Sequence, residues 1–232
     1  MSDDLNESQI ITCWEQNAAP WITAIKEEQI ASRIQCTNQA ILNAVLSLSP
    51  TTAIDIGCGE GWLTDALQKS GINTLGTDAI PALIDYAQKN RAGTFRQLTY
   101  EQVTPHYIDE IFDVAICNFS LIGQASTEQV FKGVKQLLTP TGYFVVQTLH
   151  PVHSNSDQPY EDGWREGSWQ GFNNDFINPA PWYFRTVKSW QNLFQQHGFQ
   201  SPEIRETMEA STNTPASIIF IAQPCHSLTR NR

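Results

Sequence analysis

The stretch of sequence that decides the fold reads Asp55-Ile56-Gly57-Cys58-Gly59-Glu60-Gly61. It follows a β-rich run at residues 52–56 and precedes apolar residues at helical spacing, so the local pattern is strand, glycine turn and helix. Glycines at alternate positions let the backbone turn tightly and approach a ligand without interference from a Cβ atom. The N-terminus of the following helix offers free N–H groups. We therefore expect this turn to hold a polar group of a bound ligand.

Strand and helix patterns alternate on both sides of this turn. Strands are predicted at residues 52–56, 73–77, 94–98, 112–118, 143–149, 204–208 and 217–222. Helices are predicted at residues 62–71, 79–90, 126–138 and 187–197, and residues 140–142 are predicted to form a turn. This alternation predicts an α/β fold with a doubly wound, mostly parallel seven-stranded sheet that binds its ligand at the carboxyl ends of the strands.

Two segments lie outside this regular pattern. Residues 5–48 show helical spacing and are expected to form helices that are interrupted at Pro20. Residues 150–184 lose regular periodicity but are rich in aromatic residues, which favours a functional loop over a disordered one. We expect one domain of 232 residues. Its parts are N-terminal helices (1–49), a core (50–149), an irregular insertion after the fifth strand (150–185), and a C-terminal helix and strands (186–232).

Composition excludes several classes of partner. The chain has 14 Lys and Arg against 24 Asp and Glu, a net charge of −10, and no basic cluster, so no nucleic-acid partner is expected. No run reaches the ~18 apolar residues of a membrane span, and no signal peptide is recognised, so we expect a cytoplasmic protein without a membrane partner. The five scattered cysteines predict reduced thiols and no metal site.

The run DIGCGEGWL resembles the glycine-rich first motif of class I S-adenosylmethionine (SAM)-dependent methyltransferases, and the resemblance covers roughly residues 52–149. It implies a Rossmann-like methyltransferase fold in which residues 50–149 bind SAM as the cofactor. Asp55, Gly57, Cys58 and Gly59 would hold the methionine end of SAM. A tight turn without a ligand is the alternative interpretation.

The resemblance also assigns residues to the rest of the cofactor. Asp78 stands where the family has an acid that accepts hydrogen bonds from ribose hydroxyls, although it could instead cap the helix that starts near Ile80. Ala79 and Ile80 would form an apolar wall beneath the adenine, or simply belong to the core. Thr99 replaces the family's usual adenine-binding acid, so Thr99 and Tyr100 either contact the adenine by other groups or begin a loop.

The fourth predicted strand resembles the family's FDVV-type motif. Its last residues, Asn118 and Phe119, are expected beside the transferred methyl group. The N-terminal helices, with Trp14, Trp21 and Arg33, would form a lid over SAM or would pack against the edge of the sheet.

The insertion is expected to form the acceptor site. Residues 160–166 and 181–185 resemble an uncharacterised bacterial subgroup of small-molecule methyltransferases, which supplies no substrate. His150 is a candidate general base at a strand end, or a structural histidine. Arg165 and Arg185 could bind an acceptor carboxylate, or form salt bridges with acidic residues between 161 and 166. Trp164 and Tyr183 could support a planar substrate, or cover the sheet.

The resulting hypothesis is methyl transfer from SAM to a small-molecule acceptor by in-line displacement. Two alternatives are a SAM-binding protein without turnover and a nicotinamide-dependent oxidoreductase. The second requires the spacing GxGxxG, whereas this chain has GxGxG. Neither the acceptor atom nor the oligomeric state follows from the sequence.

Overall fold

A computed structural model describes residues 6–152, 154, 158–209 and 213–225 of the chain. Its main sheet has seven strands in the order β3-β2-β1-β4-β5-β9-β8. The strands are β1 (Thr52–Ile56), β2 (Asn73–Asp78), β3 (Thr94–Gln97), β4 (Phe112–Asn118), β5 (Leu138–Leu149), β8 (Glu203–Glu209) and β9 (Thr214–Ala222). Strands β1 to β5 pair in parallel, whereas β9 is antiparallel to both β5 and β8. The predicted doubly wound, mostly parallel sheet is confirmed.

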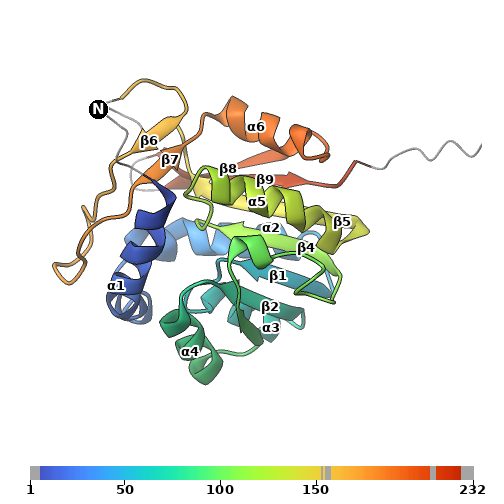
Figure 1. The fold of residues 1–232 in the computed structure, drawn as a ribbon, viewed down its shortest axis with the longest axis horizontal. Coiled ribbons are helices and arrows are strands. Elements are labelled where there is room, and N and C mark those ends of the chain that lie inside the picture. Colours follow the sequence, from blue (N-terminus) through green and yellow to red (C-terminus); the bar gives the residue numbers. More distant parts are fainter. Residues whose placement is uncertain (1–5, 153, 155–157, 210–212, 226–232) are drawn as a thin grey trace, which may run out of the picture.

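Helices cover both faces of this sheet (Figure 1). They are α1 (Glu7–Lys26), α2 (Asn38–Leu46), α3 (Trp62–Lys69), α4 (Pro81–Asn90), α5 (Ala125–Val134) and α6 (Val187–Gln196). Helices α2 and α3 pack on one face of the sheet and α5 and α6 on the other. Because side chains alternate along a strand, Val114 and Ile116 of β4 face the first pair, and Ala115 and Cys117 face the second. This two-sided burial explains why β4 is nearly all apolar.

The predicted break at Pro20 is wrong. Pro20 lies inside α1, which continues to Lys26, and the chain turns only afterwards, where Glu28 has a φ of 55°. A proline removes one helical hydrogen bond, but the buried face of α1 packs against the rest of the protein and offsets that loss. Leu5, the first residue of the predicted helical segment, lies outside the described residues.

The predicted turn at residues 140–142 is also wrong, because these residues belong to β5. Leu138 pairs with Phe112, and the next pairing joins Tyr143 to Val114, so residues 139–142 lie opposite a single residue of β4. The segment is therefore a bulge within the strand. A Pro-Thr-Gly sequence suits such a bulge as well as it suits a turn.

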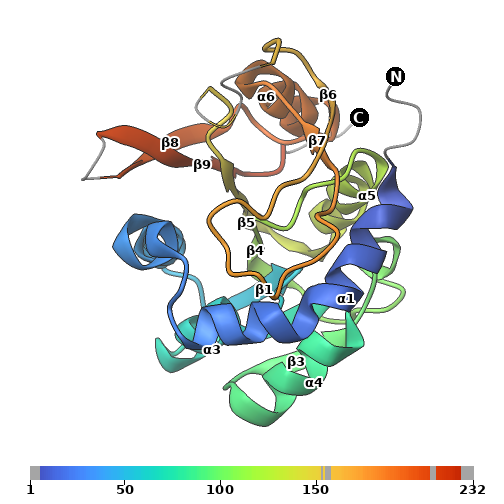
Figure 2. The same ribbon diagram turned by 90° about the vertical axis from the view of Figure 1, so that its left-hand side faces the viewer.

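The insertion between β5 and α6 contains a short antiparallel hairpin of β6 (Gly163–Arg165) and β7 (Trp182–Phe184). Figure 2 shows this orange segment beside α1, over the edge of the sheet. The Asn17 side chain fixes the two together, because it donates to the Ile177 carbonyl at 2.8 Å and accepts from the Ile177 N–H at 2.9 Å. Within the described part of the chain, no helix has both the length and the apolar character needed to cross a membrane.

Candidate active site

A cavity of about 460 Å³ lies where the carboxyl ends of β1, β2 and β4 meet. Each of the eleven cofactor-binding residues predicted from the sequence lies in its wall: Asp55, Gly57, Cys58, Gly59, Asp78, Ala79, Ile80, Thr99, Tyr100, Asn118 and Phe119. The structure therefore brings together groups that are distant in the sequence, as the topology of a parallel sheet requires.

Glycine is needed at each of the three positions in the turn, but for different structural reasons. A Cβ on Gly57 would overlap Ser120, and a Cβ on Gly61 would lie 2.7 Å from the Phe95 ring. These two positions therefore allow close packing within the protein. Among the described residues, a Cβ on Gly59 would meet only Nε1 of Trp21, at 3.5 Å, and the φ of Gly59 is +58°. Gly59 thus faces the cavity, where a side chain would occupy ligand space.

Asp78 connects the two loops of the cavity floor. One carboxylate oxygen accepts from the Gly59 N–H and the other from the Ile80 N–H, both at 2.9 Å. The N-cap of α4 is Ile80, so Asp78 supports the entry to this helix from outside it. Burial raises the pKa of Asp78. Each oxygen has a further lone pair, so the carboxylate can still accept from a ligand hydroxyl.

Asp55 is buried beneath the glycine turn and accepts a hydrogen bond from the Thr64 hydroxyl at 2.9 Å. Burial raises its pKa to about 7, and the neighbouring carboxylates of Glu60 and Asp78 act in the same direction. Below a pH of about 7 the folded protein therefore keeps this carboxyl group protonated.

We expect the pH dependence of stability to reveal this acid in an Asp55→Asn variant. From pH 3.8 to about 7 the unfolded carboxyl ionises while the folded one stays protonated, so Asp55 makes wild-type stability fall with rising pH. Above that window both states are ionised and the slope ends. Asparagine cannot ionise, so the variant should gain roughly 4 kcal/mol on the wild type across the window, at 1.36 kcal/mol for each pH unit. Urea unfolding at several pH values measures this difference, and parallel curves would contradict the raised pKa.

Tyr100 is linked through Ser120 to Ile56, the residue that precedes the glycine turn. Its hydroxyl donates to the Ser120 carbonyl at 2.8 Å, and the Ser120 hydroxyl donates to the Ile56 carbonyl at 2.7 Å. Burial raises the pKa of Tyr100 well above its usual value, so the phenol remains a donor. The Thr99 N–H donates to the side chain of Gln102 at 2.9 Å, and the Thr99 residue itself stays in the cavity wall.

The end of β4 is strained where it meets the cavity. Phe119 has a φ of +55°, a left-handed conformation that non-glycine residues seldom adopt, and its N–H donates to the Gln147 carbonyl at 2.8 Å. The neighbouring Asn118 Oδ1 is buried and has no hydrogen-bond partner among the described residues. Strain and an unpaired acceptor at one position are typical of a ligand site.

Arg33 is expected only as part of the N-terminal lid and Glu60 has no expected role, whereas the structure places both residues in the wall of the first cavity. The Arg33 guanidinium lies between the rings of Trp21 and Trp62, 5.4 and 5.1 Å from their centroids. Its Nη2 is buried without a hydrogen-bond partner among the described groups, and burial lowers its pKa. Arg33 opens a π-helical turn (Arg33–Thr37), a feature that is frequent at functional sites.

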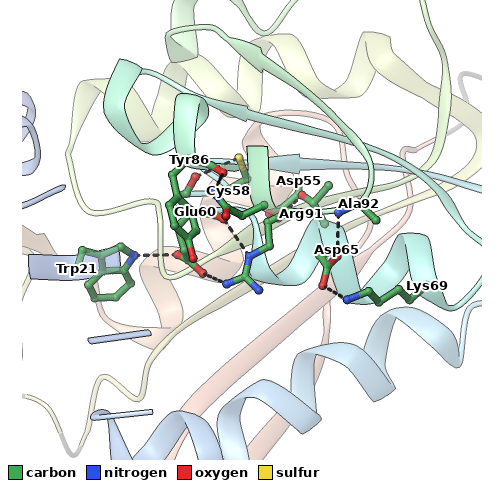
Figure 3. A network of polar contacts seen from close by, with 12 residues as sticks. Trp21, Asp55, Cys58, Glu60, Asp65, Lys69, Tyr86, Arg91 and Ala92 are labelled. Atoms are coloured by element: carbon green, nitrogen blue, oxygen red, sulfur yellow. Dashed lines mark hydrogen bonds and ion pairs between the residues drawn. The ribbon is translucent and has the colours of Figure 1, made fainter. Parts of the chain in front are cut away.

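Glu60 joins the glycine turn to α1 (Figure 3). Its Oε2 accepts from Nε1 of Trp21 at 3.0 Å, and its Oε1 lies 3.7 Å from a guanidinium nitrogen of Arg91. Helix α1 is therefore fixed over the cavity by a contact to the motif itself. In the sequence, this contact is indicated by the position of Glu60 within the glycine motif. The grouping of Trp14, Trp21 and Arg33 in the N-terminal segment also indicates it.

A second cavity of about 610 Å³ adjoins the first. The residues that line both cavities are Trp14, Trp21, Arg33, Phe119 and Ile122. Of the predicted substrate-binding residues, Arg165, Tyr183 and Arg185 line the second cavity. Trp164 is not in the lining and packs edge-on against Tyr183, with 5.6 Å between ring centroids.

Among the described residues, neither arginine of this cavity forms the salt bridge that the sequence suggested as one alternative. Arg185 is buried and donates from its two terminal nitrogens to the carbonyls of Gly123 and Gln124, both at 3.0 Å. Arg165 donates to the carbonyls of three nearby residues, Pro159, Glu161 and Trp164. Within the described residues, main-chain oxygens therefore bind these cations in place of the side-chain carboxylates between residues 161 and 166.

His150 does not join the other predicted residues. Its neighbours Leu149 and Pro151 line the second cavity, but His150 lines neither cavity, and its Nε2 lies 3.0 Å from Oε1 of Glu206 on β8. The geometry agrees with the structural alternative for this histidine. Among the described residues no group of three or more His, Cys, Asp or Glu side chains could hold a metal ion.

The comparisons with known proteins agree with this architecture. A family model described as a methyltransferase domain matches residues 30–203. Ubiquinone biosynthesis O-methyltransferases of Methylococcus capsulatus and Rickettsia prowazekii are 29% and 27% identical over 113 and 123 residues, which are 47% and 51% of this chain. These matches cover 48% of each relative, so the chain spans about half the length of the curated relatives it matches.

Solved structures show the same fold. A SAM-dependent methyltransferase structure from Listeria monocytogenes has a TM-score of 0.64 at 18% identity, covering 82% of this chain and all of that one. A magnesium protoporphyrin IX methyltransferase from Synechocystis with bound SAH has a TM-score of 0.56 at 15% identity, covering 80% of each chain. The chain therefore belongs to the methyltransferase domain family and has the fold of SAM-dependent methyltransferases.

Proposed function

We propose that the chain transfers a methyl group from SAM to a small-molecule acceptor by in-line displacement. The observation that carries the proposal is the pair of adjoining cavities, which share the wall made by Phe119 and Ile122. One cavity is built on the glycine turn and the other on the aromatic insertion. Holding a donor and an acceptor in contact is the main contribution a protein can make to a displacement reaction.

Three residues in the wall of the first cavity are suited to bind SAM. Gly59 leaves space against the backbone of the turn, and Asp78 can accept from the ribose hydroxyls. The buried Nη2 of Arg33 needs an anionic or acceptor partner, which the carboxylate of SAM would provide. Asn118 and Phe119 would lie beside the transferred methyl group, and Thr99 and Tyr100 near the adenine.

When bound, SAM supplies a methyl group that is already activated on a sulfonium. The chain's own residues then have to align the acceptor and exclude water. Helix α1 serves both purposes in this proposal, because Trp14 and Trp21 line both cavities and Glu60 fixes Trp21 to the motif. Residues 1–49 thus act as the lid, and residues 150–185 build the acceptor site, within a single domain.

The remaining assignments concern the class of acceptor and the cellular compartment. The net charge of −10 disfavours a nucleic-acid acceptor, because phosphates would be repelled. The free thiols of all five cysteines suit the reducing conditions of the cytoplasm. The O-methyltransferase names of the curated relatives favour a small-molecule acceptor.

Calorimetric titration with SAM, SAH and NADH tests the cofactor assignment. We expect SAM and SAH to bind and NADH not to bind. A methyl-release assay over a panel of small molecules then tests turnover. SAM binding without any accepted substrate would favour the alternative of a binding protein, and NADH binding would favour an oxidoreductase.

The Asp78→Ala variant tests the ribose assignment. We expect SAM affinity to fall by roughly 1.5–3 kcal/mol, the scale of hydrogen bonds to a charged group. The free energy of unfolding should fall by less than this loss of binding energy, because the N-cap position of α4 belongs to Ile80. The thermal midpoint measures this change in stability. A variant that loses several degrees of thermal stability and keeps its SAM affinity would show that Asp78 only supports the two loops.

A further inference from the structure

Arg185 is a buried cation in the wall of the second cavity, and it forms no ion pair with any of the described residues. It is 5% exposed, and its two terminal nitrogens donate to the carbonyls of Gly123 and Gln124. A guanidinium carries five N–H groups and these bonds use two of them, so three have no acceptor in the described part of the chain. Burial lowers the pKa of Arg185, because the cation has lost hydration that its partners only partly replace. A guanidinium in this state favours an anionic ligand.

The surrounding groups fix the position of this guanidinium. Its two carbonyl bonds attach it to the segment before α5, and its central carbon lies 4.7 and 5.3 Å from the ring centroids of Tyr183 and Trp190. A cation that is already ordered loses little further conformational entropy when a ligand binds. Guanidinium N–H groups match the two oxygens of a carboxylate in spacing and plane.

Arg165 brings a second guanidinium to the same cavity. The pairing of β6 with β7 places it opposite Trp182, and both residues line the cavity. Its terminal nitrogens donate to the carbonyls of Pro159, Glu161 and Trp164, but its Nε is buried without a hydrogen-bond partner among the described groups. The sequence left a salt bridge or an acceptor carboxylate open for both arginines of this cavity. Since neither forms a salt bridge within the described residues, the acceptor carboxylate is favoured.

One acidic residue, Glu166, lies in the described lining of the second cavity. It is exposed, forms no ion pair within the described residues, and also lines a separate cavity between α1 and the insertion. Arg33, Arg165 and Arg185 line the second cavity too, so its described cations outnumber this acid by three to one. The wall therefore attracts anions, although the whole chain has a net charge of −10.

Three carboxylates outside this lining also act on Arg185, and they belong to Asp162, Glu128 and Glu7. Their charges oppose the effect of burial on its pKa, but none of them forms an ion pair with it. Main-chain N–H groups engage two of them, because Asp162 accepts from residue 186 at 2.9 Å and Glu7 from residue 125 at 2.7 Å. These acids would repel a doubly charged ligand more strongly than a singly charged one.

We infer that the acceptor is a small monocarboxylate, and that Arg185 binds its carboxylate group in the second cavity. The apolar part of the acceptor lies against the aromatic rings of the wall, which include those of Trp14, Trp169 and Trp182. Phe119 lines both cavities, so the reacting atom of the acceptor meets the methyl group there. This inference rests on the proposed function and specifies its substrate class. The cavity volume of about 610 Å³ is sufficient for such a ligand.

Four naphthalene probes with the same ring system test the charge of the acceptor. They are 2-naphthoate, its neutral isostere 2-naphthamide, 2-naphthyl phosphate and (2-naphthyl)methylammonium. Each is titrated calorimetrically at neutral pH into the full chain with saturating SAH. We expect 2-naphthoate to bind at least about tenfold more tightly than 2-naphthamide, and more tightly than the other two probes. Equal or tighter binding of the amide, the phosphate or the ammonium probe, or no binding of 2-naphthoate, would overturn the inference.

Arg185→Met assigns the preference for the carboxylate to one residue. We expect 2-naphthoate to bind at least about tenfold more weakly and 2-naphthamide to change less than about twofold, so that the preference is lost. Arg205→Met is the matched control, because Arg205 pairs with Glu203 on β8 and lines neither cavity. It should keep the preference of the wild type. A purely structural role of Arg185 would weaken both probes equally, and that result would contradict the assignment.

Arg165→Met gives a second measurement if the loss of the bonds to Gly123 and Gln124 prevents Arg185→Met from folding. It removes the other guanidinium of the hairpin. We expect 2-naphthoate to bind at least about threefold more weakly, again with less than about twofold change for 2-naphthamide. An unchanged ratio between the two affinities would contradict a carboxylate site at these arginines.

A titration with SAM alone separates this inference from the proposed function. Failure of SAM to bind would contradict the proposed function, whatever the order of the probes. SAM binding together with a preference for the neutral, cationic or doubly charged probe would contradict only the substrate class.

Discussion

Gly59→Val should abolish measurable SAM binding while the protein remains folded. The Gly59 Cβ direction opens into the first cavity, where the only described atom within 4 Å is Nε1 of Trp21. Valine methyl groups would therefore fill space that the proposed ligand needs. We expect SAM affinity to fall at least roughly hundredfold, which corresponds to about 2.7 kcal/mol. Calorimetric titration measures the affinity, and circular dichroism confirms the fold.

Gly71→Val is the matched control for backbone strain. Gly71 also has a positive φ, +87°, and a Cβ there would meet no atom of the described residues within 4 Å. Both variants should lose about 1–2 kcal/mol of stability, because a β-branched residue resists the left-handed conformation. Only Gly59→Val should lose SAM binding. If the two variants bound SAM equally well, the glycine turn would not be the cofactor site.

The sequence could predict the core of the fold because its signals are local. Each strand of the parallel core is a short apolar run, and the turn from residue 57 to residue 61 marks the point where strand becomes helix. The carboxyl ends of parallel strands meet at one edge, so topology alone brings Asp55, Asp78 and Asn118 together.

Features that depend on tertiary packing could not be predicted from local sequence patterns. Pro20 suggests a helix end, but the buried face of α1 keeps the helix continuous. His150 follows a strand and is therefore a candidate base, yet position at a strand end does not determine which way a side chain points. Its ring faces Glu206 on a strand that is distant in the sequence.

The partners of the arginines also could not be predicted from the sequence. Sequence suggests carboxylate partners for Arg165 and Arg185, because acidic side chains lie nearby in the chain. In the folded protein both are bound by carbonyl oxygens, which no sequence pattern indicates. The sequence suggests Arg33 only as part of the lid, because Trp21 and Trp62, the rings on either side of its guanidinium, come from different elements.

Arg33→Met should weaken SAM binding without weakening the ligand-free protein. The buried Nη2 of Arg33 has no hydrogen-bond partner among the described residues, so its desolvation is only partly offset by the rings of Trp21 and Trp62. Methionine fills similar space without that cost, so thermal stability should stay unchanged or rise. SAM affinity should fall by roughly 2–3 kcal/mol, or about thirty- to one-hundred-and-fifty-fold.

Decarboxylated SAM identifies the group that Arg33 binds. If the guanidinium pairs with the SAM carboxylate, removing either partner should cost about the same, and removing both should cost little more than removing one. The control is Arg91→Met, because Arg91 also lies beside Glu60 but does not line the first cavity. Arg91→Met should preserve the preference for SAM over its decarboxylated form. Equal preferences in Arg33→Met and wild type would show that Arg33 only packs between its two rings.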